Sequence, residues 1–149
     1  MAEPITLDQI KRFVAAWFRV LDQHDPVENV LALLADHDLM IMIMPDQPMR
    51  DHDAIRQWYG IVTRMFFDET HYVNGVAAEI SGDGANVRVE VGWQASAWEA
   101  PAAKSKRISM GAISAWTVRR STKNAYGLEL VTQYGAIEPV KFAAGFASL

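Results

Sequence analysis

The sequence contains no cysteine. This absence excludes disulfide bonds, a thiolate nucleophile and cysteine-ligated zinc, and it suits a reducing cytoplasm. An excess of basic charge is also missing, because the formal net charge is -4 and the sequence pI is about 5.5. The chain therefore lacks the positive field that attracts phosphate backbones, and nucleic acid is not an expected partner.

Long hydrophobic stretches are absent as well. Apolar runs such as Leu39–Met44 are far shorter than the roughly 20 residues that a membrane-spanning helix needs. The first residues, MAEPITLDQIK, lack the basic flank and apolar segment of a signal peptide. We therefore expect a cytoplasmic protein without a membrane partner. The 149 residues, of which 50% are hydrophobic, are enough for one core, so a single domain over residues 1–149 is predicted.

The first half of the chain predicts three helices. Apolar residues recur at helical spacing over residues 6–23, with polar residues between them. A second helix is indicated by the acidic cap Asp25, a proline at the first helical position and Glu28 three residues after the cap. A third helix is predicted to begin at Asp51 or Asp53. Its apolar stripe is formed by Ile55, Trp58, Tyr59, Val62 and Phe66.

The second half changes to a period of two, which is typical of strands. Turn residues such as Gly82-Asp83-Gly84 separate the segments, so consecutive strands should form an antiparallel sheet with the helices on one face. This is an α+β arrangement. A short buried strand is also predicted at 39–44, and the tail 139–149 is expected to pack back on the domain or on a partner subunit. The strands of the sheet are predicted near 70–80, 86–98, 107–120 and 126–138.

Several strings, taken with this order of elements, resemble the nuclear-transport-factor-two-like superfamily, which includes SnoaL-like polyketide cyclases, ketosteroid isomerases and scytalone dehydratase. They are Leu21–Asp25 followed by Leu33–Asp36, Asp53–Tyr59 and Thr70–Gly75. The resemblance implies one SnoaL-like domain, in which three N-terminal helices pack on a curved antiparallel sheet and enclose a conical apolar pocket, as in the cystatin-like folds. It also implies a homodimer formed through the sheet.

The string Thr70–Gly75 resembles the scytalone-dehydratase-like branch in particular. That resemblance implies a catalytic pair made of His71, lining the pocket, and Asp22, at the end of the first helix. The chain departs from the pattern at two places. Leu21 stands where the dehydratase has a tyrosine, and Gly92–Gln94 stands where a second histidine is expected. No carboxylate corresponds to the catalytic aspartate of the steroid isomerases.

The residues themselves leave two interpretations of this pair open. An imidazole titrates near neutral pH, so His71 can act as a general acid or base, with a preceding carboxylate such as Asp68 fixing its tautomer. Alternatively, His71 is a strand residue satisfied by a backbone carbonyl or by solvent. Asp22 can orient a ring nitrogen from within an apolar cavity. On a helical wheel it lies away from the apolar stripe, which favours a solvated carboxylate, whereas His24 projects closer to that stripe.

Large apolar side chains are frequent for this length, since the chain has five tryptophans and seven methionines. They are expected to divide between the core and the lining of a pocket for a hydrophobic small molecule. Asn74 can share that pocket with His71 only if the strand is irregular. The Asp-His-Asp strings at 36–38 and 51–53 fall at helix ends, so no metal site is expected. The candidate ligand-binding residues are Trp17, His24, Met42, Trp58, Tyr59, Asn74, Trp93, Met110 and Tyr134.

Three functions are consistent with these observations. The leading hypothesis is a cofactor-independent lyase or isomerase of the dehydratase or cyclase type, which transfers a proton on a small hydrophobic polyketide-like or aromatic substrate. The first alternative is a non-catalytic module that binds a lipophilic small molecule. The second is a scaffold resembling the small subunit of aromatic-ring dioxygenases. Fold alone does not choose among them.

Overall fold

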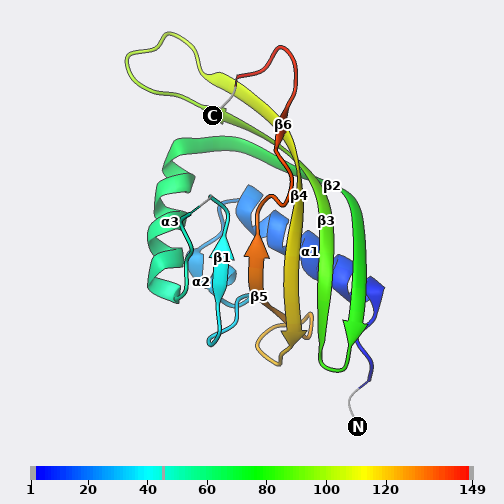
Figure 1. Ribbon diagram of the computed structural model, residues 1–149. Coiled ribbons are helices and arrows are strands. Elements are labelled where there is room, and N and C mark those ends of the chain that lie inside the picture. Colours follow the sequence, from blue (N-terminus) through cyan, green and yellow to red (C-terminus); the bar gives the residue numbers. More distant parts are fainter. Residues whose placement is uncertain (1–2, 45, 148–149) are drawn as a thin grey trace.

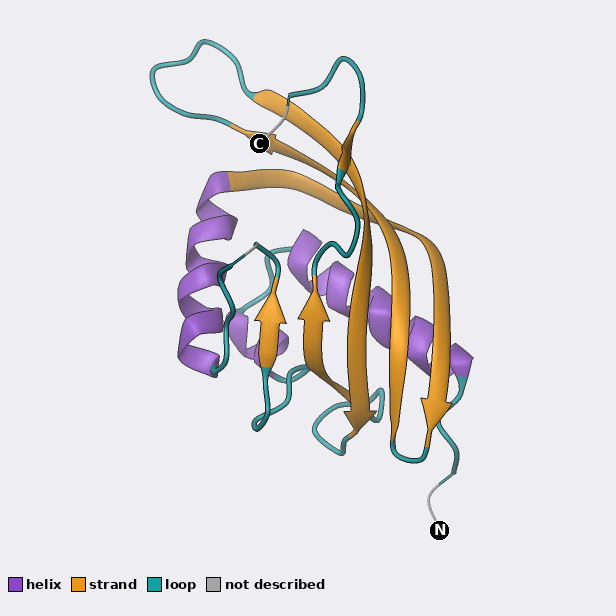
Figure 2. Ribbon diagram, viewed as in Figure 1, coloured by secondary structure: helices purple, strands orange, loops and turns teal. Residues whose placement is uncertain are grey.

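The computed structural model describes residues 3–44 and 46–147, which form an α+β arrangement (Figures 1 and 2). Helices and strands follow the predicted order, with helices first and a run of long strands afterwards. The described helices are α1 (Leu7–Asp22), α2 (Val27–Leu31) and α3 (His52–Met65). The described strands are β1 (Met40–Met42), β2 (Phe66–Ser81), β3 (Gly84–Ala97), β4 (Lys106–Arg120), β5 (Leu128–Tyr134) and β6 (Lys141–Phe142).

The strands form one mixed sheet that is largely antiparallel. Its order is β1-β5-β4-β3-β2, and β6 pairs with β4 beyond the end of β5. The exception to antiparallel pairing among the named strands is β1, which runs parallel to β5 with Met40 opposite Thr132. The predicted α+β class is confirmed, with this one parallel pair as a correction.

The core lies between α1 and one face of the sheet. α1 begins at a capping box, in which the Thr6 hydroxyl accepts from the Gln9 backbone N–H at 3.1 Å. Its apolar face packs against the alternate residues Val87, Val89 and Val91 of β3, all of which are buried. Figure 1 shows α1 crossing behind the sheet while α3 lies beside β1. Within the described residues, the other face of the sheet is therefore left without a helix.

Some predicted boundaries were wrong. α2 is a single short helix whose N-cap is Pro26, and no side chain caps it, so the expected acidic cap at Asp25 does not form. The Asp25 carboxylate instead accepts from the Asn29 side chain at 3.3 Å. β1 is shorter than predicted, and Met44 is exposed rather than buried. β2 begins directly at Phe66, because α3 ends at Met65 without an intervening turn.

The tail packs back on its own domain as far as it is described. Phe142 pairs with Met110 of β4, and the Ala147 N–H donates to the Arg107 carbonyl at 2.9 Å. No described helix is long and apolar enough to cross a membrane.

Candidate active site

Asp22 and His71 form a direct carboxylate–imidazole pair. Asp22 is the last residue of α1, and His71 lies near the start of β2. One Asp22 oxygen is 2.5 Å from His71 Nδ1, and the other accepts from the His71 backbone N–H at 2.8 Å. Because an ionised carboxylate can only accept, Nδ1 is the donor. Both side chains are mostly buried, with exposed fractions of 18% and 14%. The helix wheel placed Asp22 away from the core stripe, but its position at the helix end lets it reach the neighbouring strand.

Irregular backbone at the start of β2 surrounds His71. The pairing of β2 with β3 shifts register between Phe67 and Thr70, and again between Val73 and Gly75. Asp68 lies in the first irregularity with a positive φ of 50°. Its side chain is exposed, and Asp22 rather than Asp68 binds the His71 ring. The expectation that a preceding carboxylate fixes the tautomer was therefore wrong.

Aromatic rings enclose the His71 imidazole. Phe18, one turn before Asp22, stacks on it with ring centroids 4.5 Å apart. Trp93 lies opposite His71 in the strand register, and its ring centroid is 6.3 Å away. Within the residues that the structure describes, no hydrogen bond engages His71 Nε2. An imidazole held at Nδ1 with Nε2 free is the arrangement that a general base requires.

The pair opens onto a cleft of about 370 Å³ at the junction of α1 and β2. Phe18, Val73 and Ala15 supply its apolar lining, and polar side chains supply the rest. Arg19 lines the cleft and also donates to the Tyr126 hydroxyl at 2.9 Å. The cleft is thus more polar than the conical apolar pocket expected from the sequence. Its other lining residues are Asp22, Gln23, Glu69, Thr70 and His71.

A second carboxylate–imidazole pair lies next to the first. Glu69 hydrogen-bonds to His24 Nε2 through one oxygen and accepts from Trp93 Nε1 at 3.1 Å through the other. α1 ends before His24, so this side chain reaches Glu69 from the connection to α2 and not from the helix. Sequence analysis overlooked Glu69, although its position two residues before His71 was a usable signal.

Tyr59 is buried nearby and is held by a backbone carbonyl. Its hydroxyl donates to the Asp25 carbonyl oxygen at 2.5 Å. Burial, together with the negative charges of Asp25 and Glu69, raises the pKa of Tyr59 to about 12. The phenol is therefore neutral at ordinary pH, with its proton engaged by the backbone.

The remaining predicted ligand-binding residues are not gathered around the pair. Trp17 is in the core against Trp116, with ring centroids 6.3 Å apart. Asn74 is exposed, and its amide lies over Gly92 on the sheet face away from α1. Tyr134 is also exposed. Trp58 packs at the margin of the core, Met42 is half-buried on β1, and Met110 is half-buried opposite Trp93.

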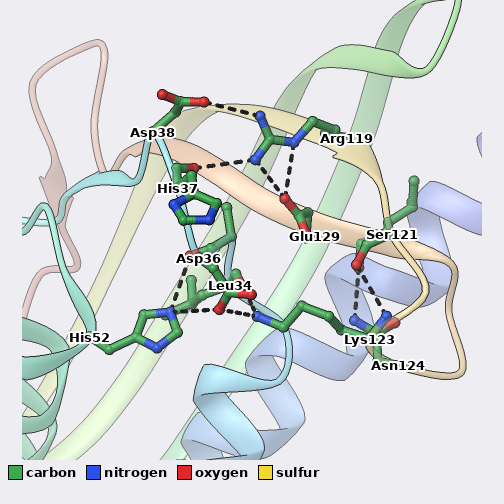
Figure 3. Close-up of polar contacts among 12 residues, drawn as sticks. Leu34, Asp36, His37, Asp38, His52, Arg119, Ser121, Lys123, Asn124 and Glu129 are labelled. Atoms are coloured by element: carbon green, nitrogen blue, oxygen red, sulfur yellow. Dashed lines mark hydrogen bonds and ion pairs between the residues drawn. The ribbon is translucent and has the colours of Figure 1, made fainter.

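Asp36, Asp38 and His52 of the Asp-His-Asp strings take part in ion pairs near the end of β4 (Figure 3). Asp51 instead caps α3 by accepting from the Ala54 N–H at 2.8 Å. Lys123 lies 2.9 Å from Asp36, and Arg119 lies 2.7 Å from Glu129. The hydrogen bond from Lys123 lowers the pKa of Asp36, and the bond to Glu129 raises the pKa of Arg119 above its ordinary value. Over residues 3–44 and 46–147, no group of three or more histidine or acidic side chains is arranged to hold a metal ion.

The SnoaL-like domain model matches residues 6–123, which include both carboxylate–imidazole pairs. The chain belongs to the SnoaL-like family. Comparison with curated proteins gives no match. The expected membership of the SnoaL-like family is therefore confirmed, and the chain has the nuclear-transport-factor-two-like fold.

Solved structures share the fold of this SnoaL-like protein at low sequence identity, and they include candidate dehydratases, dehydrochlorinases and a candidate aromatic ring hydroxylase. A type 2 hexachlorocyclohexane dehydrochlorinase is 13% identical with a TM-score of 0.74, covering 95% of this chain and 91% of its own. A candidate scytalone dehydratase from Novosphingobium aromaticivorans is 15% identical with a TM-score of 0.68, covering 95% of both chains. A nuclear transport factor 2-like protein from Salmonella enterica is 14% identical with a TM-score of 0.69, covering 95% and 96%.

Proposed function

We propose that this SnoaL-like protein is a cofactor-independent lyase that eliminates water from a small hydrophobic substrate bearing a carbonyl group. The observation that carries the proposal is the Asp22–His71 pair, which holds Nδ1 and leaves Nε2 free beside a cleft. The dehydrochlorinases and candidate dehydratases among the solved structures of this fold support elimination as the reaction class.

The chemistry follows from the pair. His71 Nε2 takes a proton from the carbon next to the substrate carbonyl, and the electron pair of that C–H bond becomes the new C=C bond. The C–O bond to the β-hydroxyl breaks, and the imidazolium returns the proton to the leaving oxygen, which departs as water. Asp22 stabilises the imidazolium charge between these two steps and fixes the ring orientation. Phe18, stacked on the imidazole, excludes water from one ring face.

The test uses β-hydroxy ketones fused to an aromatic ring as probes. In D₂O, the protein should exchange the proton next to the carbonyl, as seen by NMR, and release the dehydrated product, as seen by mass spectrometry. His71→Ala should lower both rates by roughly 10²–10⁴-fold, the usual contribution of a general base. His37→Ala, which removes an exposed histidine far from the cleft, is the matched control. Unchanged rates in His71→Ala would remove the acid–base role.

Binding without chemistry is the second candidate. It is supported by Trp93 and Gln94, which stand where the dehydratase resemblance implies a second histidine. A binding module predicts that the same ketones raise the melting temperature while neither exchange nor product appears. Stabilisation that survives in His71→Ala, without turnover in the native protein, would favour this candidate.

A further inference from the structure

The end of α1 holds a histidine where helices usually place a glycine. The His24 N–H donates to the Leu21 carbonyl and the Asp25 N–H to the Val20 carbonyl, both at 3.2 Å. This is the Schellman pattern, in which the residue after the C-cap adopts the left-handed conformation. His24 has a φ of 51°. A side chain with a Cβ is strained in this conformation, and at His24 the strain accompanies a hydrogen bond made by the imidazole.

That imidazole binds Glu69, which is itself nearly buried. The exposed fraction of the Glu69 side chain is 10%, and both of its oxygens are engaged, one by His24 and the other by Trp93 Nε1–H. Asp68, immediately before Glu69, is another non-glycine residue with positive φ. Strained backbone thus flanks both members of the pair.

Each carboxylate–imidazole pair joins one residue near the end of α1 to one residue of β2, because Asp22 binds His71 and His24 binds Glu69. On the α1 side the acid precedes the histidine, as Asp22 and His24, and on the β2 side Glu69 precedes His71. Residues two apart on a strand are separated by about 6–7 Å, so the pairs lie side by side. Trp93 connects them, because Glu69 binds its indole N–H while its ring lies 6.3 Å from the His71 ring.

We propose that Glu69, held by His24, is a positioning residue of the site. It fixes the Trp93 indole beside the His71 ring, so that the imidazole keeps one orientation toward the cleft. The catalytic part of this inference rests on the proposed function, whereas the indole positioning does not.

Three variants test the positioning. Glu69→Leu removes both acceptor atoms, Glu69→Gln keeps one oxygen for the indole, and His24→Gly removes the imidazole while relieving the left-handed strain. Asp46→Gly is the matched control, since Asp46 is an exposed non-glycine residue with a φ of 63°. The first measurement is the NMR signal of the Trp93 indole N–H, assigned with Trp93→Phe, and its hydrogen exchange rate.

We expect Glu69→Leu and His24→Gly to shift the indole signal and to speed its exchange about tenfold or more, while Glu69→Gln restores most of the native signal. On a ketone that the protein turns over, kcat should fall about tenfold or more in the first two variants with KM nearly unchanged, because misplacement of a reacting group lowers kcat. Asp46→Gly should change neither the Trp93 indole signal nor kcat.

Two outcomes overturn the proposal. An unchanged indole signal in both Glu69→Leu and His24→Gly would show that the pair does not position Trp93. Loss of stability in His24→Gly with native indole signal and native kcat would show that the pair only ties α1 to β2. The indole measurement needs no substrate. A shifted Trp93 indole signal in the variants, together with no turnover of the ketones by the native protein, would overturn the proposed function and leave the positioning intact.

Discussion

The Tyr59 hydroxyl donates to the backbone carbonyl of Asp25 at 2.5 Å and thereby links α3 to the connection between α1 and α2. That connection also carries His24, one residue away. The buried phenol therefore supports the segment from which one member of the second carboxylate–imidazole pair projects.

This hydrogen bond predicts a stability change at alkaline pH. The pKa of Tyr59 is raised to about 12 in the folded protein, against about 10 for a free phenol. A raised folded-state pKa contributes stability that is fully present below pH 10 and is lost as pH rises through 12. Urea unfolding should show a decline of up to about 1.4 kcal/mol per pH unit from this residue over that window. Tyr59→Phe should lack this component, whereas the exposed Tyr72→Phe should keep it. Equal slopes in all three proteins would contradict the prediction.

Asp22→Asn tests whether Asp22 acts on the proton-transfer step through His71 or on substrate binding. The amide preserves the shape of the side chain but not its charge, so it no longer stabilises an imidazolium at His71. On a turned-over ketone, kcat should fall by roughly 10²–10⁴-fold while KM changes little. Asp8→Asn, an exposed position on the same helix, is the control. A raised KM with a native kcat would show instead that Asp22 acts in substrate binding.

Periodicity predicted most of the fold, since the amphipathic pattern of α1 and the alternation along β3 both reflect one buried face. It failed where tertiary pairing decides the outcome. The parallel contact of β1 with β5 is non-local, and no short-range pattern encodes it. In the site, Asp22 lies off the apolar stripe and reaches His71 only because α1 ends beside β2. Glu69, by contrast, lies two residues before His71, so alternation along β2 is enough to put both side chains on one face.

Lys123 is expected to stabilise the end of α2 (Figure 3). Its ammonium donates to the Leu34 carbonyl at 2.5 Å and to Leu31 at 3.3 Å, besides pairing with Asp36. Lys123→Met should lower the free energy of unfolding by about 1–3 kcal/mol, because it leaves part-buried carbonyls unpaired. The lowered pKa of Asp36 means that its contribution is present above pH 4 and is lost as pH falls through the folded value. Lys123→Met should therefore lose less unfolding free energy than the native protein as the pH falls below about 4. Lys104→Met is the exposed control. Equal acid sensitivity in Lys123→Met and the native protein would contradict the prediction.

The homodimer expected from the resemblance stays a proposal, and we place it on the sheet face that α1 leaves uncovered. Tyr72 and Tyr134 are exposed there, next to Gly92 and Ala115 in the register. Sedimentation velocity should give a dimer for the native protein and a monomer for the double variant Tyr72→Glu with Tyr134→Glu, since buried charges at an interface are costly. Met65→Glu, exposed at the end of α3, is the control. A native monomer, or a dimer that the double variant retains, would refute this face.

Gln133 presents a buried oxygen that accepts no hydrogen bond from the part of the chain that the structure describes. It lies opposite Trp116 on β4 and Ile41 on β1, and its exposed fraction is 5%. Gln133→Met has nearly the same shape and removes the unpaired acceptor. It should leave the free energy of unfolding unchanged or raise it by about 1–2 kcal/mol, since an unsatisfied buried polar atom is destabilising. Urea unfolding measures the difference, with Gln94→Met as the control on the other sheet face. Destabilisation of more than about 1 kcal/mol would contradict the prediction.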